Sequence, residues 1–202
     1  MKIICIARNY REHAKELNNE VPENPVFFLK PDTALLQKDR DFYIPEFSSN
    51  IHYEAEVVLK ICKAGKYIQR EFAAGYFQEI SLGIDFTARD LQTRLKEKGH
   101  PWEIAKGFDG SAVIGDFFNK SNFDLNGIKF TLEKNETVVQ SGNTGDMIFD
   151  FDAIISEASQ YFTLKTGDLI FTGTPAGVGQ VLENDVLKGF LENKKVFEVD
   201  IK

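Results

Sequence analysis

The sequence predicts a chain of mixed α and β structure in which β-strands predominate (α+β). Short apolar or alternating runs, bounded by Gly, Pro or polar residues, recur along the whole chain, as strands do. Only three segments have the caps and the periodicity of longer helices, at residues 10–17, 87–99 and 150–162. Phenylalanine is abundant, with 18 residues among 202, which suits a β-rich core.

Composition and charge exclude several classes of function. The formal net charge is −7 at pH 7 and the chain has no basic run, which argues against nucleic acid or an anionic membrane surface as a partner. No apolar stretch reaches the roughly 18–20 residues that span a bilayer. Residues 1–8 turn polar too soon for a signal peptide. Cys5 and Cys62 lie in apolar runs, as reduced core thiols do, so we expect one cytoplasmic domain over residues 1–202.

The strands expected from these runs are distributed over the whole chain. They are residues 2–7, 25–31, 42–45, 51–62, 79–86, 128–133, 137–142, 169–172, 181–186 and 195–201. The two runs between 128 and 142 alternate in polarity around a short polar turn, which predicts a β-hairpin. The helix at 150–162 is expected to place Tyr161 on its inner face and to be capped by Asp150 or Asp152.

The helix predicted at 10–17 carries a candidate general base. Asn9 and Glu12 have the spacing of a capping box before it. His13 and Glu16 are i, i+3 neighbours on one helix face. A carboxylate beside an imidazole orients the ring and raises its basicity. An exposed pair without a role is the alternative.

Two carboxylates share one face of the strand predicted at 51–62. Because strand side chains alternate, Glu54 and Glu56 point the same way and repel each other. If apolar sequence covers this face, a divalent cation is the economical way to neutralise them. A solvated strand edge with two exposed glutamates is the alternative.

A third carboxylate, Asp85, stands where the strand at 79–86 meets the helix at 87–99. It either caps the helix, in competition with Thr87, or supplies a third oxygen ligand. Arg89, one turn into the helix, would face the same cavity mouth. Oxygen-only ligation favours Mg²⁺, Mn²⁺ or Ca²⁺ over Zn²⁺, and three protein ligands leave about three octahedral positions for water or substrate.

Two lysines and a glycine-rich segment have two interpretations each. Lys30 ends a strand before Pro31, as a substrate contact or as a solvated end. Lys106 lies in an aromatic, glycine-containing loop, where it either extends along apolar surface to water or points inward at an anionic site. Residues 173–179 lack the spacing of a Walker A or dinucleotide loop. Their amides either bind a carboxylate or belong to a plain connection.

Six motifs, in this order, resemble the fumarylacetoacetate hydrolase superfamily. They are Arg8-Asn9-Tyr10 with His13 and Glu16, Phe28-Leu29-Lys30-Pro31, Tyr53-Glu54-Ala55-Glu56, Asp85-Phe86-Thr87-Ala88-Arg89-Asp90, Pro101-Trp102 with residues 105–109, and Gly167-Asp168 with residues 172–179. Each motif alone is weak, but six in order are specific. Asp90-Leu91-Gln92, Pro101-Trp102 and Glu183-Asn184-Asp185 are most similar to the short acylpyruvase and oxaloacetate decarboxylase branch.

The resemblance implies a core like the C-terminal domain of that family, a mixed β-roll or barrel with a few peripheral helices, usually as a homodimer. It implies three ligands for Mg²⁺ or Mn²⁺, or for Ca²⁺ in their place: Glu54, Glu56 and Asp85. It places Lys106 beside the metal, and His13 with Glu16 as a catalytic dyad on a segment that closes over the substrate. The substrate contacts that it implies are Lys30, Arg89, Gln92 and Thr174.

The activity implied by the resemblance is metal-dependent cleavage of a C–C bond in a small 2-oxo acid. It would be acylpyruvate hydrolysis, oxaloacetate decarboxylation or both, through an enolate that the metal stabilises. An isomerase of 2-hydroxyhepta-2,4-diene-1,7-dioate, or a related isomerase, decarboxylase or hydratase of aromatic degradation, is one alternative and needs a second carboxylate contact. A non-enzymatic metal- or ligand-binding module is the other, but it has no reason to keep His13, Glu16 and Lys106 together.

Overall fold

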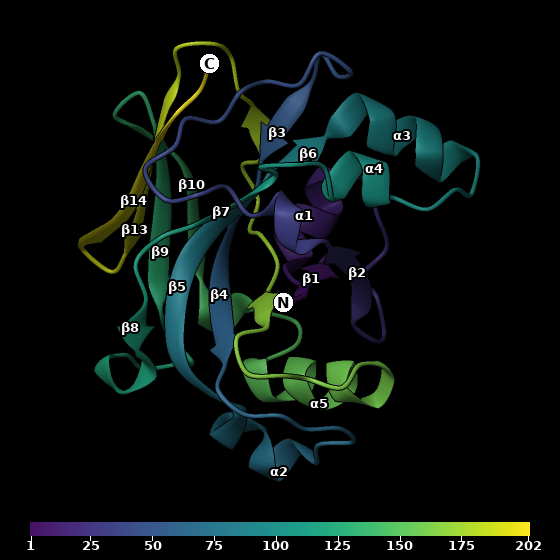
Figure 1. Cartoon of the computed structure of the whole chain (residues 1–202), viewed down its shortest axis with the longest axis vertical. Helices are drawn as coiled ribbons and strands as arrows, with labels where there is room; N and C mark the ends of the chain where they lie inside the picture. The colour runs from purple at the N-terminus through teal and green to yellow at the C-terminus, as the bar shows by residue number, and fades with distance from the viewer.

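The computed structural model describes all 202 residues, and strands dominate its architecture (Figure 1). The largest sheet has seven strands in the order β2-β1-β11-β4-β5-β7, with β8 paired to β5. A four-stranded sheet has the order β10-β9-β13-β14, and a three-stranded sheet the order β12-β3-β6. The predicted α+β class with β predominating is confirmed, and the sheets do not close into a barrel.

The elements are short and follow one another closely. The strands are β1 (Ile3–Ala7), β2 (Val26–Lys30), β3 (Ile51–Tyr53), β4 (Ala55–Ile61), β5 (Phe77–Asp85), β6 (Thr87–Ala88), β7 (Ala112–Ile114), β8 (Phe118–Asn119), β9 (Lys129–Lys134), β10 (Thr137–Asn143), β11 (Leu169–Phe171), β12 (Gly179–Gln180), β13 (Val186–Leu191) and β14 (Lys194–Asp200). The helices are α1 (Arg11–Glu16), α2 (Arg70–Ala73), α3 (Arg89–Glu97), α4 (Glu103–Lys106) and α5 (Phe151–Tyr161). Single 3₁₀ turns are η1 (Asp32–Ala34), η2 (Ala74–Tyr76), η3 (Lys120–Asn122) and η4 (Thr144–Asp146).

The antiparallel pair β4 and β5 forms the centre of the molecule. Their register runs from Ala55 opposite Ile84 to Ile61 opposite Phe77. Apolar side chains of both strands are fully buried, and each one of this size contributes about 1.5–3 kcal/mol to folding. In Figure 1, α1, α3 and α4 lie toward one end of this pair, and α5 and α2 toward the other. The strands therefore hold the residues at their ends in fixed positions.

The strand predicted at 51–62 is interrupted at Glu54. β3 pairs with β6 and β12, whereas β4 pairs with β5 and β11, so the chain changes sheets at this residue. The hairpin prediction is confirmed by the pairing of β9 with β10. Its turn residues Asn135 and Glu136 both have positive φ, at 52° and 67°. Such values suit a tight hairpin turn, whose twist matches that of the strands.

The predicted capping box at α1 is wrong. Tyr10 is the N-cap residue and makes no side-chain cap bond. The Asn9 side chain is instead buried, where its amide donates to the Phe149 and Thr172 carbonyls at 2.9 and 2.8 Å and accepts from Phe149 N at 2.7 Å. These tertiary bonds fix the start of α1 against β11 and the chain before α5.

Other helix predictions have mixed outcomes. Asp150 caps α5 by accepting from Ala153 N at 2.8 Å, as predicted, but Tyr161 is 63% exposed and does not belong to its inner face. Gly99, with φ of 64°, follows the end of α3, as predicted for a helix stop. The loop predicted around Lys106 contains a one-turn helix, α4. None of the helices combines the length and the apolar character needed to cross a membrane.

The two cysteines differ in environment. Cys5 is fully buried in β1, as predicted for a core thiol, and its burial raises the thiol pKa. Cys62 is exposed, so the same prediction is wrong for it. The chain leaves β4 at Cys62 and turns outward, which the apolar run before it did not indicate.

Replacement of Asp168 by Asn is expected to lower the free energy of unfolding at pH 7 by about 1.5–3 kcal/mol, the scale of hydrogen bonds to a charged group. Asp168 accepts from the backbone N of Lys2 at 3.0 Å and of Lys165 at 2.7 Å, and pairs with Lys2 Nζ. Burial alone would raise the pKa of Asp168, but these contacts lower it below its ordinary 3.8. Its contribution is therefore complete above that value and is lost as the pH falls through the folded pKa.

Urea unfolding at pH 7 and at pH 3 tests this sign, because the difference between D168N and the unmodified chain should shrink at pH 3. Asp116 is a matched control, since its pair with Lys38 at 2.7 Å is exposed on both sides. Asp116→Asn should cost less than about 1 kcal/mol. Equal costs for D168N at both pH values would contradict the linkage.

Candidate metal centre and active site

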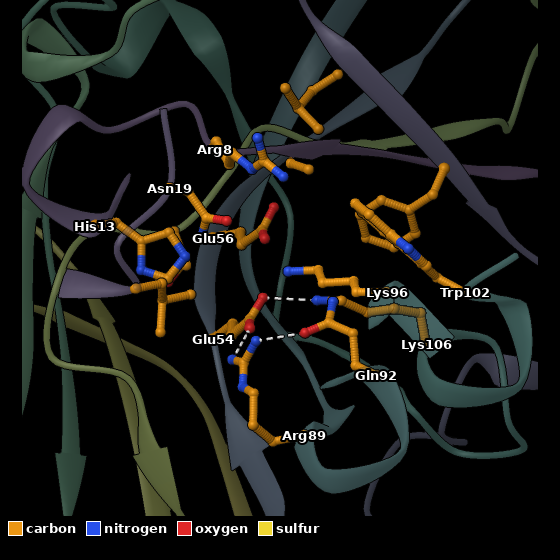
Figure 2. A pocket seen from close by; sticks show the side chains of 15 residues that line it. Arg8, His13, Asn19, Glu54, Glu56, Arg89, Gln92, Lys96, Trp102 and Lys106 are labelled. Atoms are coloured by element: carbon orange, nitrogen blue, oxygen red, sulfur yellow. Dashed lines mark hydrogen bonds and ion pairs between the residues drawn. The ribbon is translucent and has the colours of Figure 1, made fainter. Parts of the chain in front are cut away.

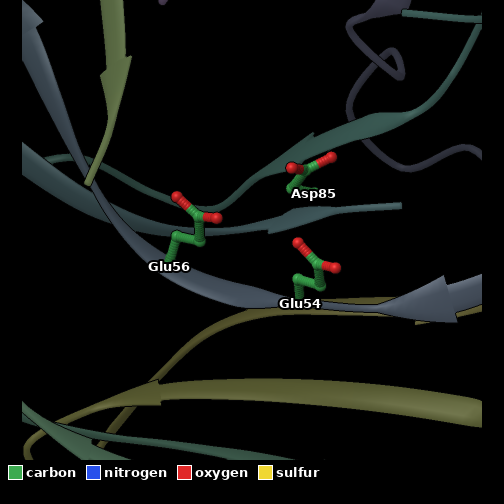
Figure 3. Close-up of side chains that lie close together, drawn as sticks. All are labelled: Glu54, Glu56 and Asp85. Carbon is green, nitrogen blue, oxygen red and sulfur yellow. The ribbon is translucent and has the colours of Figure 1, made fainter. Parts of the chain in front are cut away.

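Three buried carboxylates converge where β4 begins and β5 ends (Figure 3). One oxygen each of Glu54, Glu56 and Asp85 lies within 4.8 Å of the others. Asp85 is the last residue of β5 and donates its backbone N–H to Glu54 O at 2.8 Å, so the two side chains are cross-strand neighbours. The exposed fractions of Glu54, Glu56 and Asp85 are 5%, 2% and 0%, so the alternative of a solvated strand edge is wrong.

Cations contact two of these carboxylates but not the third. Lys106 Nζ lies 2.7 Å from both Glu54 Oε2 and Asp85 Oδ2. Arg89 pairs with the other oxygen of Glu54. Glu56 has no cationic partner, and its one hydrogen bond comes from the Gly173 N–H, which donates to Oε2 at 2.6 Å. The glycine-rich segment thus supplies an amide to a carboxylate of the chain itself.

The pKa directions follow from this arrangement. Burial would raise the pKa of Glu54, but Lys106, Arg89 and His13 hold it far below its usual range. The pKa of Glu56 is raised well above its usual value by burial, and then by the charges of Asp85 and Glu54. A buried carboxylate next to two others, without a counter-charge of its own, is costly to ionise. A divalent cation among the three would remove that cost.

The donor set fits Mg²⁺ or Mn²⁺. All three donors are carboxylate oxygens, and such sites favour hard divalent cations. Asp85 Oδ1 is buried and lacks a hydrogen bond of good geometry, although Lys30 Nζ stands 2.7 Å away. No His or Cys belongs to the cluster. Three protein oxygens would leave coordination positions open for a ligand.

Lys30 and Lys106 approach the cluster from different sides. Lys106 ends α4 and points inward, 4% exposed, and the pKa of its ammonium is raised by Asp85 and Glu54 despite burial. Lys30 is 1% exposed and ends β2. Its Nζ donates to the Lys106 carbonyl and, at 3.1 and 3.0 Å, to the carbonyl and hydroxyl oxygens of Ser111. This placement behind Asp85 favours a positioning role for Lys30 over the predicted contact with substrate.

The predicted pair on α1 faces the same region. His13 Nδ1 lies 3.2 Å from Glu16 Oε2, and His13 is only 5% exposed. Burial lowers the pKa of His13, while Glu54 and Glu16 oppose that shift, so the ring is neutral at pH 7. The other oxygen of Glu16 accepts from Gly177 N at 3.0 Å, which ties α1 to the glycine-rich segment.

A pocket joins these side chains (Figure 2). It is lined by Ile6, Ala7, Arg8, His13, Leu17, Asn19, Phe28, Glu54, Glu56, Arg89, Gln92, Lys96, Trp102, Lys106 and Thr174. Most of the predicted site residues are among them, whereas Asp85, Lys30 and Glu16 do not line the pocket. Arg89 reaches from α3 to Glu54 and donates to Gln92 Oε1 at 2.7 Å. The motifs that lie far apart in the sequence therefore meet at one cavity.

The sequence profile of the family described as fumarylacetoacetate (FAA) hydrolase, C-terminal, matches residues 2–202. The chain belongs to this family. Oxaloacetate decarboxylase, mitochondrial, of Dictyostelium discoideum is 43% identical over 189 residues, which cover 93% of this chain and 87% of that protein. Oxaloacetate tautomerase FAHD1, mitochondrial, of Bos taurus is 38% identical over 187 residues, 92% of this chain and 85% of that protein.

A solved structure of the family is also close to this fold. It is the fumarylpyruvate hydrolase of Pseudomonas aeruginosa in complex with Mn²⁺ and pyruvate. It superposes with a TM-score of 0.93 at 34% identity and covers 100% of this chain and 89% of its own. The resemblance inferred from the six motifs is confirmed, including its short branch.

Two groups of residues in this member of the family escaped sequence reasoning. Gln140 on β10 is 1% exposed, accepts from Ala55 N at 2.9 Å and donates to Thr174 Oγ1 at 2.8 Å. It thereby fixes the backbone between the two glutamates. Arg8 and Lys96 line the pocket as cations, and Arg8 has a positive φ of 63°. Arg8 belongs to the first of the six family motifs, but the resemblance implies no role for it. The sequence positions of Lys96 and Gln140 gave no indication that either residue belongs to the site.

Proposed function

We propose that this protein is a divalent-metal-dependent enzyme that cleaves a C–C bond in a small 2-oxo acid, by hydrolysis of an acylpyruvate, by decarboxylation of oxaloacetate, or both. The observation that carries the proposal is Glu56, a buried carboxylate that faces Glu54 and Asp85 without a cationic partner. Mg²⁺ or Mn²⁺ held by these three residues supplies the missing charge. When bound, such an ion polarises a substrate carbonyl and stabilises the negative charge that develops as the C–C bond breaks.

Lys106 supports this chemistry from the protein side. Its ammonium is buried against Glu54 and Asp85 and opens on the same pocket. A fixed positive charge in a site of low dielectric lowers the energy of negative charge on a substrate oxygen. Lys30 holds both Asp85 and the Lys106 carbonyl, so we assign it a positioning role.

His13 and Glu16 serve the hydrolytic reaction. The Glu16 carboxylate orients the ring through Nδ1, which leaves Nε2 free to take a proton from water. That water attacks the distal carbonyl of an acylpyruvate. Decarboxylation needs no water attack, so His13 matters less there. The cavity is small, with a volume of about 30 Å³.

The relatives support an oxo-acid substrate but not a single reaction. Their names give oxaloacetate decarboxylase, oxaloacetate tautomerase and a fumarylpyruvate hydrolase crystallised with Mn²⁺ and pyruvate. Enol–keto exchange, decarboxylation and hydrolysis all pass through negative charge on the oxygen of a 2-oxo group. A dioate isomerase remains the alternative within this chemistry. A cytoplasmic location, a homodimer and one domain over residues 1–202 stay predictions.

Purified protein with Mn²⁺ or Mg²⁺ is expected to release pyruvate from acetylpyruvate and from oxaloacetate. EDTA should abolish turnover and added metal restore it, because no protein group replaces the cation at Glu56. A control reaction with metal but without protein measures the spontaneous decarboxylation of oxaloacetate, which is subtracted. Enol–keto exchange of oxaloacetate and isomerisation of the dioate are followed by ultraviolet absorbance in parallel. Absence of pyruvate release from both substrates, with metal present, would reject the proposed activity in favour of these others.

A further inference from the structure

Two cations in the pocket wall have no anionic partner. Arg89 and Lys106 both pair with Glu54, but Arg8 and Lys96 form no ion pair and no side-chain hydrogen bond. Both are half-buried, and in Figure 2 both point into the space in front of Glu56. The acidic residues that line the pocket are Glu54 and Glu56 alone. The wall thus carries two positive charges that form no ion pair within the protein.

The surroundings make these charges costly without a ligand. Lys96 Nζ stands 5.1 Å from the centroid of the Trp102 ring, which covers one side of the ammonium. Burial lowers the pKa of Lys96 to about 8, and the next contributions come from the positive charges of Arg8, Arg89 and Lys106. Arg8 takes up a left-handed backbone conformation, which is unfavourable for a residue with a side chain. Like charges brought together in this way favour binding of an anion between them.

We propose that Arg8 and Lys96 bind the distal carboxylate of a dicarboxylate substrate, so that this site selects 2-oxo dicarboxylates over 2-oxo acids whose far end is neutral. The proposal rests on the proposed function for the placement of the other end of the substrate at the three carboxylates. Arg8 offers a planar donor pair that matches a carboxylate, and Lys96 a second charge. The Trp102 ring covers one side of the Lys96 ammonium, which strengthens its attraction for an anion.

The side chain of Lys96 fits this role better than a structural one. It lies in the last turn of α3, on the helix face of buried Gln92, whereas its neighbours Glu97 and Lys98 are exposed. A lysine that served only solubility would point outward with them. Its long, flexible stem can move aside as the substrate enters.

The test compares two substrates with the variants Arg8→Met and Lys96→Met. Each variant should lower kcat/KM for fumarylpyruvate, whose distal carboxylate survives cleavage of the C–C bond, by about 10- to 100-fold, the scale of a hydrogen bond between charged groups. Acetylpyruvate has a neutral methyl ketone at its far end. The factor by which each variant lowers its kcat/KM should be at least about tenfold smaller than for the dicarboxylate substrate. Lys98→Met removes a charge at the exposed residue that follows the same helix and should leave both values unchanged. Equal losses for the two substrates would overturn the proposal, as would no loss for fumarylpyruvate.

A binding experiment separates this proposal from the proposed activity. Isothermal titration in the presence of Mn²⁺ compares malate with 2-hydroxybutyrate, which replaces the distal carboxylate by a methyl group and is not cleaved. The unmodified chain should bind malate at least about tenfold more tightly, and Lys96→Met should remove most of that preference. If pyruvate release fails but this preference is found, the activity is rejected and the dicarboxylate site stands. Equal affinity for the two acids overturns the dicarboxylate site whatever the enzyme does.

Discussion

Replacement of Glu56 by Gln is expected to abolish metal binding and metal-dependent turnover while leaving the fold intact. Gln retains an oxygen that accepts from Gly173 N, but it loses the charge that we assign to the cation. Because Glu56 is a buried carboxylate next to Glu54 and Asp85, its neutral replacement should not destabilise the metal-free protein. Mn²⁺ at a concentration about 100 times its Kd should stabilise the unmodified chain by about 2.7 kcal/mol and E56Q not at all.

Thermal unfolding with and without Mn²⁺, together with titration of Mn²⁺ into each protein, measures both parts of this prediction. Glu54→Gln should also lose Mn²⁺ binding, but it leaves Lys106 and Arg89 without one carboxylate partner and should reduce stability as well. Glu79→Gln changes the same residue type in an exposed pair with Lys60 and should keep the full metal-dependent shift. A normal Mn²⁺ shift in E56Q would remove Glu56 from the ligand set.

The face shared by Glu54 and Glu56 could be predicted from the period of a strand, but its burial could not. Both are buried because β5, the glycine-rich segment and α4 cover them, and those contacts are set by strand order and not by local sequence. The position of Asp85 has the same origin. Its position in the sequence was compatible with a helix cap as well as with a metal ligand. Only the register of β4 with β5 places Asp85 beside Glu54. The family motifs supplied this information where local rules did not.

Local rules failed where a tertiary partner offered more than a local one. Asn9 has the residue type and spacing of a helix cap, yet its amide satisfies buried backbone groups of two distant segments instead. Leaving those groups unpaired would cost more than a missing cap at the start of a short helix. The interruption at Glu54 is similar, since the run of alternating residues is continuous but the chain passes from one sheet to another there.

Arg8 and Lys96 show a different limit. Each is an ordinary charged residue in its own segment, after β1 and within α3. Their meeting in one pocket depends on how those two elements are placed relative to each other. The spacing of carboxylates and imidazoles along a chain carries chemical meaning, whereas the position of a single arginine or lysine does not. A cation without a partner can be recognised only after every neighbour is known.

His13→Ala is expected to reduce acetylpyruvate hydrolysis by about 10²- to 10⁴-fold, the usual contribution of a general base. Oxaloacetate decarboxylation should fall by less than about tenfold, because no water has to be activated there. Glu16→Gln is the companion variant, since its amide oxygen can still accept from Gly177 N while the charge that orients His13 is lost. It should show the same bias toward hydrolysis with a smaller loss. Equal losses of both activities in H13A would contradict this division of roles.

The pH dependence gives an independent measure of the same residue. Burial lowers the pKa of His13 below its ordinary 6.5, and only the neutral ring can accept a proton. Hydrolysis should therefore rise as the pH increases through that lowered pKa and be level by about pH 7. In H13A, the residual rate of hydrolysis should no longer rise with pH over this range. Decarboxylation by the unmodified chain should not slow down at low pH in this way, because its rate does not depend on the base. If both reactions slow down over the same pH range, His13 acts in a step that is common to them.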